Sequence, residues 1–152
     1  MTLAVLTLLA VLMPINSQAT RMDADPLSTY RWTHRLLVVD FPDTESGRAA
    51  LEAFRTALET QLDDVRERDL LIVPIGDLPH AGQTRRLWVD LGSPERLAVR
   101  RRLGLAERDA QLVLIGKDGG VKARQSQGAF DLAAVFALVD RMPMRRAETK
   151  RR

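Results

Sequence analysis

Residues Gln111–Arg124 read QLVLIGKDGGVKAR, and this stretch decides the fold. It begins with an apolar run, continues through a Lys-Asp-Gly-Gly turn, and ends in a second segment that contains valine. Glycine in such a turn permits the positive φ angles that tight hairpins require. The stretch therefore predicts a β-hairpin whose strands are Gln111–Ile115 and Val121–Gln127.

The chain around this hairpin contains no cysteine among its 152 residues. Disulfides, thiolate zinc sites, dithiol redox centres and peroxidatic thiols are therefore excluded. Only two histidines, His34 and His80, could serve as imidazole ligands or bases. With 45% hydrophobic and 28% charged residues, the composition is that of one globular domain.

Upstream of the hairpin, strand and helix patterns alternate. The apolar segments Arg35–Phe41 and Leu70–Ile75 are typical of strands buried on both faces of a sheet. Between them, apolar residues at spacings of three and four predict an amphipathic helix over Gly47–Arg68. Two such strands joined by one helix form a parallel, right-handed βαβ unit.

The remaining segments complete a mixed α/β order. Residues 78–93 predict only a weak strand, and a helix with Ser93 at its N-cap follows and ends at Gly104. After the hairpin, a last helix begins at Asp131 and ends near Pro143. The order βαβ, helix, ββ, α predicts an α/β domain with a mixed sheet.

This order resembles the thioredoxin fold, with a central four-stranded sheet (βαβ then ββα) flanked by helices. A closer resemblance rests on five segments: Tyr30-Arg31-Trp32, Arg35–Val39, Glu67-Arg68-Asp69, Leu114–Lys122 and Arg141–Arg146. Together they look like the P-DUDES domain, a thioredoxin-like domain of bacterial exported proteins. That domain also occurs in the sushi-repeat-containing and DRO/URB/equarin extracellular proteins. The family has no established catalytic residues, so the resemblance implies no catalytic residue and no cofactor here.

The resemblance also implies where redox groups would lie. Thioredoxins carry their thiols after the first strand, where this chain has Pro42–Gly47. They place a cis-proline just before the third strand, where this chain has Gln111. The loop of Asp43, Thr44, Glu45 and Ser46 is therefore a candidate degenerate active-site loop. It either contacts a ligand or cation, or supplies the N-cap and first-turn acids of a helix.

An enzyme of non-thiol chemistry is an alternative. It would need His34 or His80 to meet Asp40, Asp43 or Asp77 in one pocket, as a metal site or a general base. No HExxH or HxH spacing is present, so the sequence predicts no metal ligands.

Basic residues offer a second alternative, since the formal net charge is +3. The candidate contacts for an anion or a partner are Arg100, Arg101, Arg102, Arg145 and Arg146. The same residues could instead be solvated cations near helix C-termini. No aromatic residues are interleaved with them, so nucleic acid is not an expected partner. We expect Trp32 and Trp88 to be packing anchors.

Residues 1–19 have the pattern of a secretory signal peptide: a short apolar core followed by the small-x-small triplet Ser17-Gln18-Ala19. An uncleaved anchor is the alternative, and cleavage would leave no stable transmembrane anchor. The predicted organisation is a signal peptide (1–19), a thioredoxin-like domain (20–146) and a basic C-terminal tail (147–152). The expected location is the periplasm or the extracellular space.

These observations predict an exported thioredoxin-like domain without thiol chemistry. We expect it to act as a non-catalytic binding or structural module of the cell envelope, and its partner to be a protein or an envelope polyanion. The alternatives are an enzyme of unrecognised non-thiol chemistry and a polyanion-binding protein that uses the basic patches.

Overall fold

The computed structural model describes residues 25–78, 82–126 and 130–151. The predicted signal peptide and His80 lie outside these residues. Within the described ranges, no helix has the length and apolar character needed to cross a membrane.

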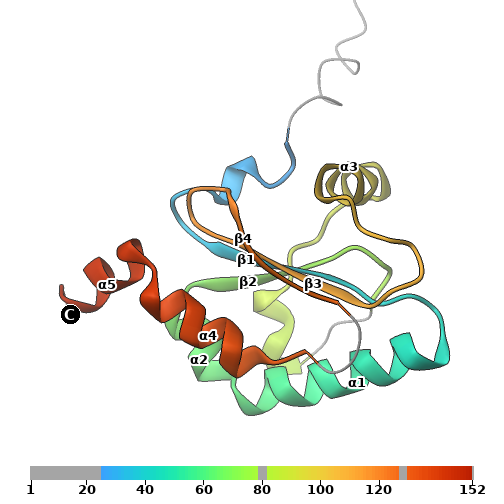
Figure 1. Ribbon diagram of the computed structural model, residues 1–152, viewed down its shortest axis with the longest axis horizontal. Helices are drawn as coiled ribbons and strands as arrows, with labels where there is room; N and C mark the ends of the chain where they lie inside the picture. Colours follow the sequence, from blue (N-terminus) through green and yellow to red (C-terminus); the bar gives the residue numbers. More distant parts are fainter. Residues whose placement is uncertain (1–24, 79–81, 127–129, 152) are drawn as a thin grey trace, which may run out of the picture.

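Four strands form one mixed sheet in the order β2-β1-β3-β4 (Figure 1). Their bounds are β1, Arg35–Asp40; β2, Leu70–Pro74; β3, Gln111–Ile115; and β4, Val121–Ser126. Strand β1 is parallel to β2 and antiparallel to β3, and β3 is antiparallel to β4. The strands predicted over Arg35–Phe41 and Leu70–Ile75 are confirmed to within one residue at each end, and so is the hairpin, although Gln127, its predicted last residue, lies outside the described residues.

Helices cover both faces of this sheet (Figure 1). One face packs against α1 (Glu45–Thr60), α2 (Leu62–Glu67), α4 (Leu132–Arg141) and the 3-10 helix η3 (Gly82–Leu87). The other face packs against α3 (Ser93–Leu103) and the segment that holds the 3-10 helix η2 (Ser28–Tyr30). Because both faces are covered, every residue of β1 is buried, which explains its continuous apolar run.

An aromatic cluster fills the core beneath α1. The Phe41 and Phe54 rings lie 5.6 Å apart, and Phe54 meets Trp88 edge-on at 6.5 Å. The indole N–H of Trp88 donates to Thr84 Oγ1 at 3.3 Å, so its one polar atom is satisfied. Trp88 is thus confirmed as a packing anchor. The same prediction is wrong for Trp32, whose left-handed backbone turns a 68% exposed side chain away from the core.

Two local predictions are corrected. The long helix predicted over Gly47–Arg68 is interrupted at Gln61, whose φ of −114° and ψ of 28° separate α1 from α2. Residues 78–93 form η3 and an isolated bridge between Ile72 and Trp88 instead of a strand. The 3-10 helix places Trp88 in the core. The N–H of the next residue, Val89, donates to the Ile72 carbonyl of β2 at 2.8 Å.

The ends of two helices also differ from the prediction. The N-cap of α3 is Gly92 rather than Ser93, because the carboxylate of Glu95 accepts a 2.7 Å hydrogen bond from the Gly92 N–H. Pro143 does not end the fold but begins another helix, α5 (Pro143–Thr149), because proline's fixed φ suits a first helical turn. The predicted domain boundary between residues 146 and 147 therefore falls inside α5.

Gly47 is buried in the first turn of α1, where a Cβ would lie 2.0 Å from the Pro42 carbonyl oxygen. We predict that Gly47→Ala lowers the free energy of unfolding by about 1–3 kcal/mol, because the backbone must move to relieve the clash. The measurement is urea unfolding, with the exposed neighbour Ser46→Ala as the control, expected to stay within about 0.5 kcal/mol. Equal stabilities of Gly47→Ala and the wild type would contradict this packing.

Candidate functional site

A cleft of about 490 Å³ opens where β1 ends and α1 begins. We call it the Asp40 cleft, and its charged lining is Asp40, Asp43, Arg48, Arg55, Asp77 and Arg100. Its lining includes Pro42, Asp43 and Gly47 of the segment to which the thiols of a thioredoxin would map. Residues from β1, α1, α3 and the loop after β2 therefore meet at this end of the sheet.

Asp40 is the buried charge of this cleft. Its side chain is 4% exposed, and Oδ2 lies 2.6 Å from Nη2 of Arg100 on α3. Burial raises the pKa of Asp40 above its ordinary value, and the opposing charge and hydrogen bond of Arg100 offset this only in part. A perturbed carboxyl at the edge of a cleft is a common mark of a functional site.

The loop of Asp43, Thr44, Glu45 and Ser46 serves as the start of α1. Thr44 Oγ1 accepts a 3.0 Å hydrogen bond from the Gly47 N–H and forms the N-cap. Asp43 pairs with Arg48 at 2.6 Å, and Ser46 Oγ lies 3.2 Å from Thr44 Oγ1. Glu45 is the acid of the first helical turn, where the helix dipole favours it. The loop therefore caps a helix and places no nucleophile beside a base.

The carboxylates of the enzyme alternative line one cleft, where each pairs with a different arginine, and His34 does not join them. Asp40, Asp43 and Asp77 all line the Asp40 cleft. His34 precedes β1 at its other end, about 20 Å away for a six-residue strand, and its Nδ1 lies 3.1 Å from Thr33 Oγ1. Within the described ranges, no three His, Asp or Glu side chains gather closely enough to hold a metal ion.

The arginines predicted as partner contacts do not form one surface. On α3, Arg100 enters the Asp40 cleft, Arg101 is exposed, and Arg102 pairs with Asp25. On α5, Arg146 is exposed, whereas the Arg145 side chain is only 3% exposed. Arg145 is thus a buried structural residue in this fold.

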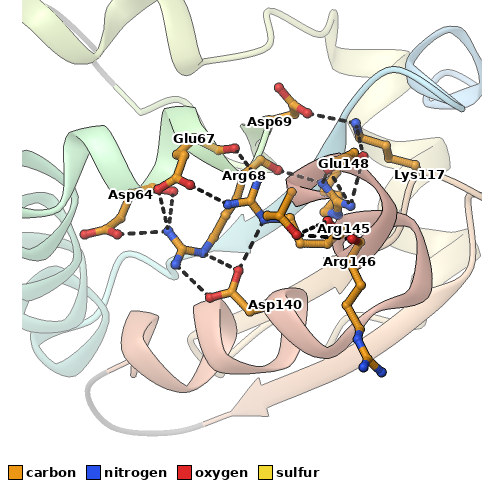
Figure 2. Close-up of polar contacts among 11 residues, drawn as sticks. Asp64, Glu67, Arg68, Asp69, Lys117, Asp140, Arg145, Arg146 and Glu148 are labelled. Atoms are coloured by element: carbon orange, nitrogen blue, oxygen red, sulfur yellow. Dashed lines mark hydrogen bonds and ion pairs between the residues drawn. The ribbon is translucent and has the colours of Figure 1, made fainter. Parts of the chain in front are cut away.

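A second polar site lies at the opposite end of β1 (Figure 2). We call it the Lys117 cluster: Arg35, Glu67, Arg68, Asp69, Lys117, Asp140, Arg145 and Glu148. The Lys117 ammonium donates to Asp69 Oδ2 at 2.8 Å and to Glu148 Oε1 at 2.7 Å. The guanidinium of Arg35, almost fully buried, donates to Glu148 at 3.3 Å and to the Arg68 carbonyl at 2.9 Å.

The other half of the Lys117 cluster fixes α4 and α5 to α2. Arg145 donates to the Glu67 carboxylate at 2.7 Å, to the Glu67 carbonyl at 2.8 Å and to Asp140 at 3.3 Å. Arg68 pairs with Asp140 at 2.7 Å and stacks over the Phe136 ring. The hydrogen bond from Arg68 is the main reason that the pKa of Asp140 is lowered.

Sequence reasoning did not identify this cluster as a unit, although its signal was present. Four of the five segments that carry the family resemblance supply its side chains, through Arg35, the Glu67–Asp69 triplet, Lys117 and Arg145. The fifth segment contacts it through the backbone, because the Trp32 N–H donates to the Lys117 carbonyl at 2.7 Å. Each of the five segments therefore places at least one residue at this end of the sheet.

A family model described as a domain of unknown function (DUF4174) matches residues 26–148. Coiled-coil domain-containing protein 80 of Danio rerio is 27% identical over 134 residues, which are 80% of this chain and 15% of that protein. The chain thus corresponds to a small part of a much longer relative.

Two solved peroxiredoxins share the fold. The reduced 2-Cys peroxiredoxin of Plasmodium vivax superposes with a TM-score of 0.53 at 15% identity, over 75% of this chain and 68% of that one. The mitochondrial 2-Cys peroxiredoxin of Plasmodium falciparum gives 0.52 at 13% identity, over 75% and 78%. These likenesses confirm the predicted thioredoxin-like fold, here in a chain without cysteine.

We predict that Glu148→Gln lowers the free energy of unfolding at pH 7 by about 3 kcal/mol, because it leaves the buried Arg35 without its carboxylate and Lys117 with Asp69 alone. The control is Glu52→Gln, which removes an exposed partner of Arg55 and is expected to cost about 0–1 kcal/mol. Urea unfolding measures both. Equal losses in the two variants would show that the Lys117 cluster adds nothing beyond a surface pair.

The contribution of Glu148 to stability should depend on pH. Burial alone would raise the pKa of Glu148, but the hydrogen bonds and charges of Lys117 and Arg35 hold it below its ordinary value. Such a carboxyl stabilises the fold above its unfolded pKa of about 4.3, and this contribution disappears as the pH falls through the folded pKa. The stability gap between wild type and Glu148→Gln should therefore narrow below about pH 4. A gap that is constant from pH 7 to pH 3 would refute the assignment.

Proposed function

The chain belongs to the family described as a domain of unknown function (DUF4174), and from this premise we propose that it is an exported, non-catalytic binding module. In this proposal the Asp40 cleft receives an anionic group of the partner, either a protein carboxylate or a charged group of an envelope polymer. The support comes from the lining of the cleft, the chemistry that the lining lacks, and the sequence of residues 1–19.

The observation that carries the proposal is that three arginines, Arg48, Arg55 and Arg100, line one cleft, where each pairs with a carboxylate. Guanidinium forks bind carboxylates and phosphates through paired hydrogen bonds. The partner of Arg48 is Asp43, which is 94% exposed, so this pair contributes little stability in water. An incoming anion can therefore replace Asp43 at low cost.

The same lining favours binding over catalysis. Its residues are arginines, aspartates, glycine, proline, leucine and phenylalanine, so the described part of the cleft holds no imidazole, thiol or hydroxyl nucleophile. The nearby hydroxyl of Thr44 is engaged as a helix cap. Asp40 is a carboxyl with a raised pKa, but its Oδ2 lies 2.6 Å from Nη2 of Arg100, so this carboxyl is already engaged by a cation.

Export is supported by the sequence of residues 1–19 and by the resemblance to the P-DUDES domain, a domain of bacterial exported proteins. We predict that cell fractionation finds the chain outside the cytoplasm, and that N-terminal sequencing of this material begins at Thr20. A cytoplasmic chain that retains residues 1–19 would contradict export and leave the binding proposal to the next experiment.

We predict that hexaglutamate and short-chain polyphosphate, used as anionic probes, bind the purified protein with a salt-sensitive affinity. Arg48→Gln and Arg48→Gln/Arg100→Gln should weaken binding by about threefold and tenfold, the latter about 1.4 kcal/mol. Arg101→Gln is the matched control, because Arg101 is exposed on α3 outside the cleft, and it should change affinity less than twofold. Isothermal titration calorimetry measures the affinities.

Binding that Arg101→Gln weakens as much as the cleft variants would point to general surface charge and overturn the proposal. Binding that survives in Arg48→Gln/Arg100→Gln would do the same. Arg48→Gln alone guards against misfolding, since Arg48 is a solvent-exposed residue whose loss leaves Arg100 to neutralise the buried Asp40.

A further inference from the structure

Trp32 combines an exposed side chain with a strained backbone conformation. Its side chain is the most exposed of the large hydrophobic residues in the described ranges, and its φ is 67°. A left-handed conformation costs about 1–3 kcal/mol for a residue with a bulky side chain. Glycine or asparagine would occupy this position more easily. Stability therefore gives no reason for tryptophan here.

The surrounding backbone holds this conformation firmly. The Trp32 N–H donates to the Lys117 carbonyl at 2.7 Å, and the N–H groups of Thr33 and His34 both donate to the Tyr30 carbonyl. Asp69, the other described non-glycine residue with a positive φ, pairs with the ammonium of Lys117. Both strained residues thus contact Lys117, and the Lys117 cluster fixes the base from which the indole projects.

A rigid, exposed tryptophan is the residue type that most often anchors a protein–protein interface. It offers a large apolar area, and because its position is already fixed, little conformational entropy is lost on binding. Its counterpart Trp88 shows the contrast, since that indole is buried in the core and its N–H is satisfied by Thr84. Trp32 has the exposure of a contact residue and not of a core residue.

The charges beside Trp32 indicate what kind of partner it fits. Arg31 and Arg102 both pair with Asp25, whose side chain is 22% exposed. Lys122 pairs at 2.6 Å with Asp118, whose side chain is 42% exposed. The ammonium of Lys117 is held by two carboxylates. These carboxylates are less open to water than Asp43 of the Asp40 cleft, which is 94% exposed, so an anionic surface would displace them less easily. A protein with a neutral rim therefore fits this surface better than a membrane or a polyanion does.

We propose that Trp32 is the anchor of a protein-docking surface and that its indole enters an apolar pocket on a partner protein. This surface lies at the opposite end of β1 from the Asp40 cleft, so it does not depend on the function proposed for the cleft. The partner is expected to bind without strong salt dependence, which separates it from the anionic group that the cleft would receive.

The test begins with a photo-crosslinking residue, p-benzoylphenylalanine, placed at position 32 in the full chain and expressed in cells. The matched control carries the same residue at position 97, because Leu97 is also an exposed hydrophobic residue, on α3. A protein trapped from position 32 and not from position 97 is then purified. Its affinity for the uncrosslinked wild type and for Trp32→Gly and Trp32→Asn is measured by titration.

We expect both variants to bind at least about 30-fold more weakly than the wild type, with Trp32→Phe intermediate. We also expect the Tm of Trp32→Gly and Trp32→Asn to equal or exceed that of the wild type, because the backbone strain is relieved. Acrylamide quenching of tryptophan fluorescence should fall when the partner binds, since the quencher then loses access to Trp32.

Several outcomes would overturn the proposal. A lower Tm in both variants would show that Trp32 is structural. The proposal would also be refuted if both variants kept the wild-type affinity. The same holds if crosslinking trapped a protein equally from both positions, or trapped none from position 32. Trapping of lipid alone, or of a second copy of this chain alone, would assign Trp32 to a different contact.

Discussion

The ammonium of Lys117 lies between the carboxylates of Asp69 and Glu148, and the end of the sheet depends on this contact. A buried cation is costly unless it is paired and hydrogen-bonded. Arg35 and Arg145 meet the same requirement beside it. The start of β1, the turn before β2, the β-hairpin and α5 must therefore assemble together, because none of these cations is neutralised within its own element.

The two ends of the sheet use charge in opposite ways. In the Lys117 cluster, buried cations have several acceptors each, and the arrangement allows little exchange. In the Asp40 cleft, Arg48 pairs with a carboxylate that is open to water. Pairs of the first kind fix geometry, whereas pairs of the second kind leave cations available to another anion. The Lys117 cluster at one end of β1 thus holds a rigid structure, whereas the Asp40 cleft at the other end has an ion pair whose anion can be replaced.

Much of the architecture could be predicted from sequence because its signals are local. The apolar runs of β1 and β2 and the glycine turn before β4 each determine their own conformation. The same is true of Asp131, whose carboxylate caps α4. The break at Gln61 could not be predicted, since residues on both sides favour a helix and tertiary packing decides where it bends.

The residues of the two polar sites show why function was harder to predict. Arg145 and Arg146 are adjacent and identical in sequence, yet one is buried against Glu67 and the other is exposed. The difference in burial arises because α5 packs beside the end of α2, where Arg145 contacts Glu67 and Arg146 does not. Trp32 was expected in the core because tryptophan usually packs there, and its exposure follows from a φ angle that composition does not reveal.

The position of Glu148 has a consequence for the order of events during synthesis. It is 113 residues beyond Arg35, which it neutralises. Translation proceeds from the N-terminus, so β1, β2 and the hairpin leave the ribosome before the carboxylate that completes their shared end. Until α5 has been made, Arg35 lacks its carboxylate and Lys117 has Asp69 alone, so the contacts at this end of the sheet can be completed only after the last helix is synthesised.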